Sequence, residues 1–487
     1  YTSLAADVLA RWKRLQGHDV FFLTGTDEHG QKVEKAAQDA GEDPQGFTDR
    51  VSQSFRTLTT AMGFSNDAFI RTTEPRHRAA CQALWQRLHD RGEIYLGGYE
   101  GWYAVRDEAF YGPDELVERD GARYAPSGAP VEWVTEPSYF FRLSAWQDRL
   151  LAFYERNPDF IAPASRRNEV IAFVKAGLQD LSISRTSFRW GVPVPGDDAH
   201  VMYVWLDALT NYVTALGWPD EDAETWKFWP ADVHFVGKDI LRFHAIYWPA
   251  FLMAAGLPAP RRVFAHGWWT NEGQKISKSL GNVIDPIALV EEFGLDPVRY
   301  FLLREVPFGQ DGDFARAALV NRTNGELADV LGNLANRTLA LIQRNCEGLL
   351  PAEATAAPED AELFGPLTAL PEIVAQHLDR QEFHLALETI FAAARAGNGY
   401  ITSQAPWALK KTDPVRMAMV LRHLHTALRG YATLLQPFMP ASMAALLDQL
   451  GVPTDRRGLD SLGTALPQGT PLPPPAPLFR KMDQAPR

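Results

Sequence analysis

Cysteine is nearly absent from this sequence. Only Cys81 and Cys346 occur among 487 residues, and one pair so far apart in the chain is no disulfide framework. Two isolated cysteines also cannot build a multi-cysteine zinc knuckle. We therefore expect a protein of a reducing compartment, and we place it in the cytoplasm.

Positive charge and long apolar runs are scarce as well. The 48 Lys and Arg residues face 60 Asp and Glu residues, for a net charge of −12, which argues against a surface for unselective nucleic-acid binding. A local basic track that reads one shaped RNA stays open. No apolar run reaches transmembrane length, so we expect no membrane partner. The sequence also lacks a P-loop and a dinucleotide-binding glycine fingerprint, so any ATP must bind by another route.

What the chain does contain is an alternation of helices and strands. The segment "DVFFLTG" at 19–25 is a short apolar strand, typical of a parallel sheet that is buried on both faces. Helices are expected at 31–40, 45–62 and 76–91, and further strands at 201–206, 232–236 and 262–266. This order predicts an α/β fold with a doubly wound parallel sheet.

The sequence changes character several times along the chain. We expect the first half of the α/β domain at 1–92, a small β-rich insertion at 93–143, the second half at 144–267, a loop region at 268–314, a helical domain at 315–450 and a proline-rich tail at 451–487. The helical domain follows from apolar stripes at helical spacing, namely Leu327, Leu331, Leu334 and Leu341, interrupted by Thr338, and Met417, Leu421, Leu424 and Leu428. For the tail we expect a solvated terminus.

One loop stands out by its lysines. "GQKISKSLGN" at 273–282 follows a predicted strand, at the sheet edge where α/β proteins bind ligands. Its lysines suit phosphate groups, because an ammonium is a compact charge that can follow a moving anion. A solvated basic turn explains the same composition.

Three other stretches carry candidate binding residues. In "LTGTDEHG", Asp27 is either an acid for a substrate amine or metal, or a helix N-cap. In "FVGKDILRFH", Gly237 and Asp239 suit a flat ligand with ribose hydroxyls, and a strand-to-helix turn is the alternative. In "YVWLDALTNY", an aromatic stripe at helical spacing forms either a pocket or part of the core.

Taken together, these motifs resemble one family. "LTGTDEHG", "GWY…RDEA", "ISR", "YVWLDAL", "GKDILRFH", "KISKS", "NLANR" and "APW" occur in the order found in methionyl-tRNA synthetases of the bacterial type, which are class I aminoacyl-tRNA synthetases. The resemblance runs from Tyr1 to about residue 450. "KISKS" stands where the class has Lys-Met-Ser-Lys-Ser, and isoleucine there changes no charge.

The resemblance implies a Rossmann-like catalytic domain, an all-α anticodon-binding domain and a two-step reaction. Methionine is activated by ATP with Mg²⁺ to methionyl-adenylate, and the methionyl group then passes to the 3′ end of initiator and elongator tRNA(Met). The enzyme is expected to be a monomer. Other class I synthetases fit less well, because about fifty residues at 93–143 cannot hold an editing domain and the cysteine enzyme needs zinc-binding cysteines.

The resemblance also assigns roles to residues. Lys278, Lys275, Asp27 and Arg185 are the catalytic set, with Arg185 paired to Asp27, which holds the methionine ammonium. The ATP set is Gly237, Asp239, His244, Lys278 and Ser279. The methionine pocket is Asp27, Trp205, Leu209, Tyr212, Ile240, His244 and Trp248, although some members have proline at the place of Leu209. The anticodon set is Asn333, Arg337 and Trp407.

The sequence departs from the family in two places. The insertion at 93–143 has no cysteine, so we predict no zinc there, although some members carry zinc knuckles. The class signature His-x-Gly-His is expected just before "YTSLAADVLARW" and is not in the sequence. We therefore expect a polypeptide of these residues to be weakly active. The alternative function is a catalytically impaired tRNA-binding protein derived from such a synthetase.

Overall fold

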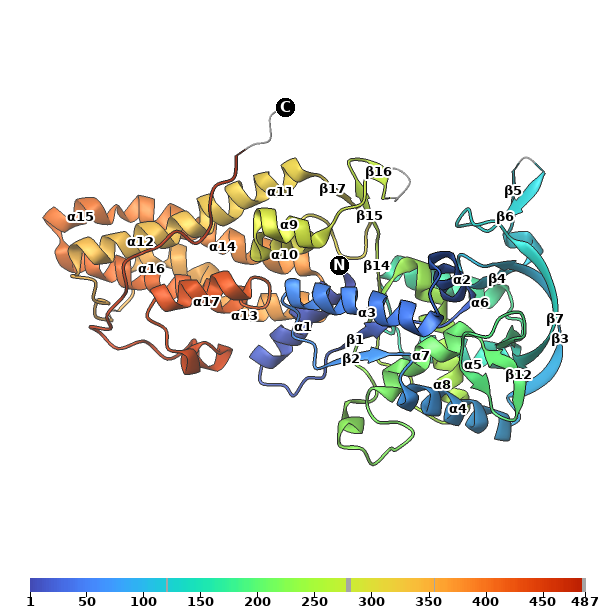
Figure 1. Cartoon of the computed structure of the whole chain (residues 1–487). Coiled ribbons are helices and arrows are strands. Elements are labelled where there is room, and N and C mark those ends of the chain that lie inside the picture. The colour runs from blue at the N-terminus through green and yellow to red at the C-terminus, as the bar shows by residue number, and fades with distance from the viewer. Residues whose placement is uncertain (120, 277–281, 354, 484–487) are drawn as a thin grey trace. The chain divides into compact units, whose positions relative to one another are not determined.

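The computed structural model describes residues 1–119, 121–276, 282–353 and 355–483, and its chain forms two compact units (Figure 1). The α/β unit comprises residues 21–59 and 66–266. The helical unit comprises residues 1–20, 60–65 and those from 267 onward. The N-terminal residues, which we expected with the α/β domain, therefore belong to the helical unit.

Short parallel strands form the centre of the α/β unit. Strand β1 (Leu23–Thr26) pairs in parallel with β2 (Ala68–Arg71). Strand β13 (His234–Gly237) pairs in parallel with β14 (Val263–His266), which also pairs with β8 (Ile161–Ala162). The parallel pairing agrees with the predicted α/β class, and the carboxyl ends of β1 and β13 carry the candidate binding motifs.

The strand expected at 201–206 is partly wrong. Strand β12 (Asp197–Met202) is antiparallel to β10 (Ser184–Arg185) and β11 (Pro193–Val194), and helix α7 (Val204–Thr214) starts two residues after β12 ends. A short apolar run does not distinguish a strand from a helix by its periodicity. In this segment the strand ends at Met202, and the residues from Val204 onward form a helix because their apolar side chains have helical spacing.

Helices cover the strands of this unit. The first three begin and end within one residue of their predicted positions: α2 (Gln31–Ala40), α3 (Pro44–Ala61) and α4 (Pro75–Asp90). Pro75 suits the first position of α4 because that position has no intrahelical N–H bond to lose. The others are α5 (Gln147–Arg156), α6 (Ala164–Ala176), α7 and α8 (Trp248–Ala255), with a π-helical turn at Phe243–Tyr247 before α8.

The insertion is built on a long antiparallel ribbon. Strands β3 (Ile94–Ala104) and β7 (Glu132–Phe141) are its two sides, curved at the right of Figure 1. Strand β4 (Ala109–Tyr111) pairs with the outer edge of β3, and β9 (Leu181–Ser182) pairs with the outer edge of β7. Strands β5 (Val117–Arg119) and β6 (Ala122–Tyr124) form a separate hairpin. The turn between β3 and β4 carries the "RDEA" motif.

Long helices form most of the helical unit. They are α1 (Thr2–Leu15), α9 (Pro286–Phe293), α10 (Leu295–Arg304), α11 (Arg316–Arg322), α12 (Asn333–Asn345), α13 (Ala361–Asp379), α14 (Phe383–Gln404), α15 (Pro406–Thr412), α16 (Pro414–Leu435) and α17 (Pro440–Gln449). A π-helical segment at Thr323–Gly332 leads into α12. A small sheet of β15 (Trp269–Asn271), β16 (Gln274–Lys275) and β17 (Gly312–Phe314) follows the α/β unit in the chain.

Both predicted apolar stripes lie in the core of the helical unit. All four members of the α16 stripe are buried, and in the other stripe only Leu341 is partly exposed. Helix α1 is fixed to α10 by a fully buried ion pair, in which Arg299 Nη2 donates to Asp7 Oδ2 at 2.6 Å. Arg299 also donates to the backbone carbonyls of Met62, Pro437 and Phe438.

Most described residues of the proline-rich tail are exposed or half-buried, as expected for a solvated segment, but hydrogen bonds attach it to the helix bundle at several points. Arg429 of α16 donates to the carbonyl oxygens of Arg456, Ser461 and Thr464 at 2.7–3.0 Å. Farther along, Asn324 and Met482 exchange two hydrogen bonds. The composition of the tail predicts only solvation, but side chains of the helix bundle also donate hydrogen bonds to backbone carbonyls of the tail.

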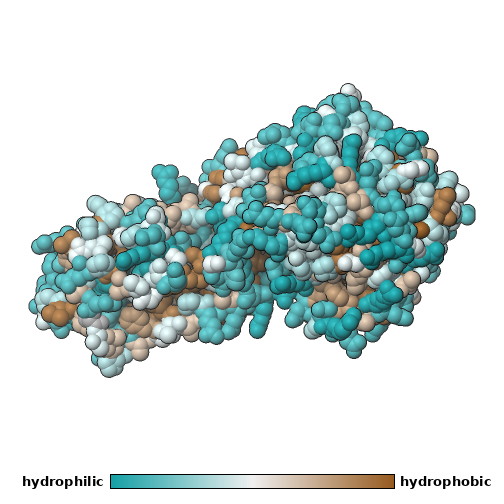
Figure 2. All heavy atoms as spheres, turned by 90° about the horizontal axis from the view of Figure 1, so that it is seen from below, coloured by the Kyte–Doolittle hydropathy of each residue, from teal (hydrophilic) through white to brown (hydrophobic). Residues whose placement is uncertain are grey.

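The surface is mostly hydrophilic on the face in Figure 2, where apolar residues form small separate patches. Among the described residues, no helix is long and apolar enough to cross a membrane.

Candidate functional site

The loop after β1 is held rigidly from both sides. The Glu28 carboxylate accepts two bonds from Arg71, at 2.8 and 2.9 Å, and one from the Thr73 hydroxyl at 2.5 Å. The indole of Trp190 donates to the Glu28 carbonyl at 2.6 Å, while Gly30 N donates to the Trp190 carbonyl. Asp27 therefore stands on a loop with little freedom to move.

Asp27 is the exposed acid of this loop. The pKa of the carboxyl is nevertheless raised to about 6, mainly by desolvation and then by the nearby charge of Asp207, while His77 and His29 oppose the shift. Such a carboxylate gains most from a cationic partner, because a positive charge replaces the solvation that it has lost. The arrangement suits a substrate ammonium.

Asp207 lies between two imidazoles below the loop. His29 Nδ1 and His77 Nε2 each contact one Asp207 oxygen at 2.7 Å, and Cys81 Sγ lies 3.2 Å from His77 Nε2. Burial alone would raise the pKa of Asp207, but the two histidines hold it well below its usual value. The atoms of His77, Cys81 and Asp207 have the spacing of metal ligands, yet each already makes a contact within the group.

Aromatic side chains gather where α7 meets the segment before α8. Trp205, Leu209 and Tyr212 follow one another at helical spacing on α7, and Leu209 is buried. The Trp205 ring stacks on Phe243 at 3.8 Å between centroids, and the Tyr212 ring lies 6.1 Å from that of Trp248. All of these side chains are apolar or aromatic, which suits contact with a thioether group.

His244 is neutral and its hydrogen-bonding pattern is determined. Its Nδ1 donates to the carbonyl of Ile240 at 3.0 Å, since a carbonyl can only accept. Its Nε2 therefore accepts from the Tyr212 hydroxyl at 2.7 Å. Burial lowers the pKa of His244 to about 4, although the Ile240 contact and the Asp239 charge raise it. The π-helical turn at Phe243–Tyr247 sets this orientation, and such turns are frequent at functional sites.

Gly237 ends strand β13 at the carboxyl edge of its sheet. A Cβ at this position would lie 2.4 Å from Asp239 Oδ1, so any larger residue would displace that carboxylate. Glycine therefore lets Asp239 fold back over the strand end, where α/β sheets bind ligands.

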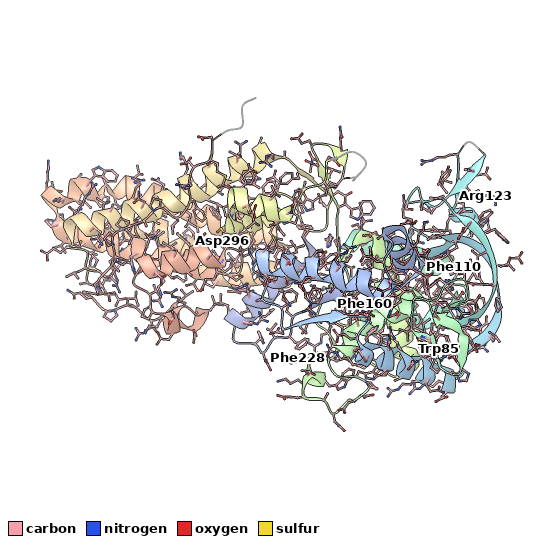
Figure 3. All side chains as sticks on the ribbon, in the orientation of Figure 1. Trp85, Phe110, Arg123, Phe160, Phe228 and Asp296 are labelled. Atoms are coloured by element: carbon pink, nitrogen blue, oxygen red, sulfur yellow. The ribbon has the colours of Figure 1, made fainter. Side chains whose placement is uncertain are left out.

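Arg185 has a different ionic partner from the one expected. Its Nε lies 3.8 Å from Glu136 Oε1, and its guanidinium packs against Phe110, Tyr203 and Tyr103 at 4.2–5.4 Å from the ring centroids. Phe110 projects from β4 (Figure 3). Among the ion pairs of the described residues, Arg185 is paired with Glu136 on β7 of the insertion and not with Asp27. Nη2 is buried without a hydrogen-bond partner among the described residues.

The lysine loop lies largely outside the described residues. The backbone of Lys275 belongs to β16, paired with Thr270. Lys278 and Ser279 fall outside the part of the chain that the structure describes. Their expected contacts with phosphate stay predictions.

The three residues expected to read an anticodon are grouped in the helical unit. The guanidinium of Arg337 lies 5.6 Å from the ring centroid of Trp407, and Trp407 is 47% exposed. Asn333 is exposed one helical turn before Arg337 on α12, where its amide contacts Asn398. An exposed ring beside a guanidinium and an amide suits an unstacked base.

Sequence reasoning missed two features of the site. The contacts of Asp207 with His29 and His77 join residues that are 178 and 130 positions apart. The only local signal was the spacing of His77 and Cys81 on one helix face. Glu108 of "RDEA" was noted as part of a motif but given no role, and burial raises the pKa of its carboxyl to about 7.

Two family models together match nearly the whole chain. The model described as class I tRNA synthetases (M) matches residues 1–339. The model of the anticodon-binding domain of methionyl tRNA ligase matches residues 350–487. The first match ends within helix α12, and residues 340–349 separate it from the second.

Individual relatives are similar over almost their full length. The methionine–tRNA ligase of Brucella suis biovar 1 (strain 1330) is 55% identical over 487 residues, which are 100% of this chain and 95% of that protein. The enzyme of the same description from Rickettsia bellii (strain RML369-C) is 59% identical over 460 residues, 94% of this chain and 90% of that protein.

A solved structure is similar throughout. Mycobacterium tuberculosis methionyl-tRNA synthetase bound by methionyl-adenylate is 51% identical, with a TM-score of 0.96 over 99% of this chain and 96% of that chain. The apo form of the same protein is 48% identical, with a TM-score of 0.89 over 99% of this chain and 94% of that chain.

Proposed function

This chain belongs to the class I tRNA synthetases of the methionine type, and from that premise we propose that it is a methionine–tRNA ligase. It activates methionine with ATP to methionyl-adenylate and transfers the methionyl group to the 3′ end of tRNA(Met). The observation that carries this proposal is the grouping of Asp27 with a wall of aromatic side chains at the carboxyl end of the parallel strands.

Asp27 and the aromatic wall select the amino acid. The Asp27 carboxylate takes the ammonium, and Trp205, Tyr212 and Trp248 surround the side chain, with Leu209, Ile240 and His244 completing the pocket. A neutral imidazole suits this place, because a charged one would disfavour an apolar side chain and repel the ammonium. The polarizable thioether gains from contact with the ring edges.

ATP binds beside this pocket as its Mg²⁺ complex. Gly237, Asp239 and His244 face the adenosine, with the Asp239 carboxylate accepting from ribose hydroxyls. The methionine carboxylate attacks the α-phosphorus and pyrophosphate leaves. Lys278, Lys275 and Ser279 stabilise the charge that develops on the leaving phosphates, a role that rests on the motif alone. Such electrostatic stabilisation is usually the largest contribution to catalysis.

Arg185 acts from the wall of the site. Buried between Glu136 and three aromatic rings, it keeps Nη2 free of hydrogen-bond partners among the described residues. We assign it an indirect electrostatic role toward Asp27 in place of the direct ion pair that the resemblance implies.

The remaining features complete the proposal. Asn333, Arg337 and Trp407 bind the tRNA anticodon, and both initiator and elongator tRNA are substrates. The enzyme acts as a cytoplasmic monomer, in keeping with its two reduced cysteines. The insertion holds no zinc because it has no cysteine, and stoichiometric zinc found by elemental analysis would contradict this.

The deciding experiment is amino-acid-dependent ATP–pyrophosphate exchange by the full-length protein. Methionine is compared with leucine, isoleucine, valine and cysteine. We expect exchange with methionine alone, and a loss of about 10²–10³ in rate for Lys278→Ala. Lys35→Ala serves as the control, since Lys35 is an exposed lysine on α2 with a surface partner. A folded protein that binds tRNA but exchanges with no amino acid would establish the tRNA-binding alternative instead.

A further inference from the structure

Glu108 brings a carboxyl from the insertion to the loop that carries Asp27. It lies in the turn between β3 and β4, and its Oε1 is 2.5 Å from the position of a Cβ built on Gly30. Val204, at the start of α7, lies 3.4 Å from the same point. A larger residue at position 30 would have to displace the carboxyl, and the φ of +109° at Gly30 also favours glycine. Glu108 thus sits where the insertion, the Asp27 loop and α7 meet.

The backbone of Glu108 is strained and is held in place by two hydrogen bonds. Its φ is +50°, in the left-handed region that side-chain-bearing residues seldom adopt. The Tyr203 hydroxyl donates to the Glu108 carbonyl at 2.8 Å, and Glu108 N donates to the Val105 carbonyl at 3.3 Å. Strain of this kind persists where the surrounding structure enforces it, and it concentrates at functional sites. The surrounding structure therefore fixes the position from which the Glu108 side chain projects.

The carboxyl itself lacks a partner for one oxygen. Oε1 is buried without a hydrogen-bond partner among the described residues. Burial is the main cause that raises the pKa of Glu108 to about 7, with Asp27 adding to the shift and the charge and backbone N–H of Lys32 on α2 opposing it. Tyr103 on β3 and Tyr203 before α7 also face it. A buried polar atom without a partner calls for an explanation.

Most other titratable groups of the site are already engaged. Asp27 receives the substrate ammonium, and His244 uses both ring nitrogens. His29 Nδ1 is bound to Asp207, while its Nε2 is also buried without a hydrogen-bond partner among the described residues. The transfer step nevertheless needs a proton acceptor, because a ribose hydroxyl must lose its proton as it attacks the methionyl carbonyl. We propose that Glu108 is the general base of the transfer step, an inference that rests on the proposed function.

In the transfer step, one bond forms at the methionyl carbon and one breaks, and the proton has a defined acceptor. The Glu108 carboxylate takes the hydroxyl proton as the new ester bond forms between the ribose oxygen and the methionyl carbon. The bond from that carbon to the adenylate phosphate oxygen breaks, and its electron pair leaves with AMP. Glu108 then returns the proton to solvent.

Glu108→Gln separates the two steps of the reaction. We expect ATP–pyrophosphate exchange with methionine at the wild-type rate, and single-turnover transfer from preformed adenylate to tRNA slowed by about 10²–10⁴. Wild-type transfer should rise with pH through about 7, the pH at which the base ionises, and that rise should be lost in the variant. Glu108→Asp keeps a carboxylate and tolerates the left-handed backbone, so it should regain part of the rate and the pH dependence.

The control is Glu100→Gln, an exposed acid on β3 of the same ribbon. The proposal is overturned if Glu108→Gln transfers at the wild-type rate, or if exchange and transfer fall equally, since equal losses mean that Glu108 merely supports the Asp27 loop. Absence of exchange in the wild-type protein would instead refute the proposed function, so the two failures are distinguishable.

Discussion

Asp27 illustrates at the scale of one residue how a binding site stores free energy. Its carboxyl meets the solvent, but it is desolvated enough to raise its pKa from 3.8 to about 6. In the proposed complex an ammonium would relieve that cost. The ionised Asp27 carboxylate therefore stabilises the folded protein only when the substrate ammonium is bound beside it.

Replacing Asp27 should therefore improve stability and weaken methionine binding. The folded pKa lies above the unfolded one, so ionisation of Asp27 weakens folding as the pH rises from about 4 to about 6, and the deficit persists above that window. We expect Asp27→Asn to gain thermal stability relative to the wild type across this window. Melting temperatures measured from pH 4 to 8 test this, with Asp39→Asn, an exposed acid on α2, as the control. A variant that melts below the wild type at pH 7 would contradict it.

The same substitution should impair methionine recognition. A hydrogen bond to a charged group is worth about 1.5–3 kcal/mol, so the KM for methionine in exchange should rise by roughly tenfold to a hundredfold. In the wild type that KM should also rise as the pH falls below about 6, where Asp27 takes up its proton. An unchanged KM at pH 5.5 would show that another group holds the ammonium.

At the scale of elements, helix α16 does more than fill the core. Its apolar face packs into the bundle, while Arg422 and Arg429 reach the tail and donate to backbone carbonyls. The described tail has few regular elements, so side-chain donors supply the hydrogen bonds that a helix or sheet would supply. Two arginines thus order a segment whose composition favours solvation.

Arg429→Met tests this function of α16. The variant keeps an apolar stem but leaves the carbonyls of Arg456, Ser461 and Thr464 without their donor. These acceptors belong to exposed or half-buried residues, so water can reach them once the guanidinium is gone, and each lost hydrogen bond costs about 0.5–1.5 kcal/mol. We therefore expect the free energy of unfolding to fall by about 2–4 kcal/mol, measured in urea. Faster proteolysis at 454–470 should accompany it. Arg395→Met, on an exposed part of α14, should change neither.

At the scale of the whole molecule, the chain divides its proposed tasks between two units. The residues proposed to bind methionine and adenosine lie in the α/β unit. Those proposed to read the anticodon lie in the helical unit, which also contains the lysine loop. Methionine recognition and tRNA selection should therefore respond to different substitutions.

Trp407→Ala should separate these two tasks. Stacking of a base on an aromatic side chain is worth about 1–3 kcal/mol, so kcat/KM for tRNA in aminoacylation should fall by roughly tenfold to a hundredfold. Exchange with methionine should stay unchanged, because it needs no tRNA. Val415→Ala, at the exposed start of α16, is the control. A loss of exchange in Trp407→Ala would contradict a purely tRNA-binding role.

Local patterns in the sequence predict most of the helices and strands named above and their order. Helices α2, α3 and α4 and the apolar stripe of α16 follow from periodicity, which reflects which faces are buried, a property of neighbouring residues. The motifs identified the family for the same reason, since each is a short local pattern. The strand expected at 201–206 failed where a short apolar run suited both a strand and a helix.

Which side chains become partners depends on how distant elements pack against one another. Arg185 pairs with Glu136 across 49 positions of sequence, and Asp207 joins two histidines from distant elements. Glu108 reaches Gly30 from the insertion, and the arginines of α16 hold the tail. Each of these contacts depends on how separate elements pack, because an ionic or hydrogen-bonding group takes the nearest suitable partner in space. Periodicity and composition contain no information about that distance.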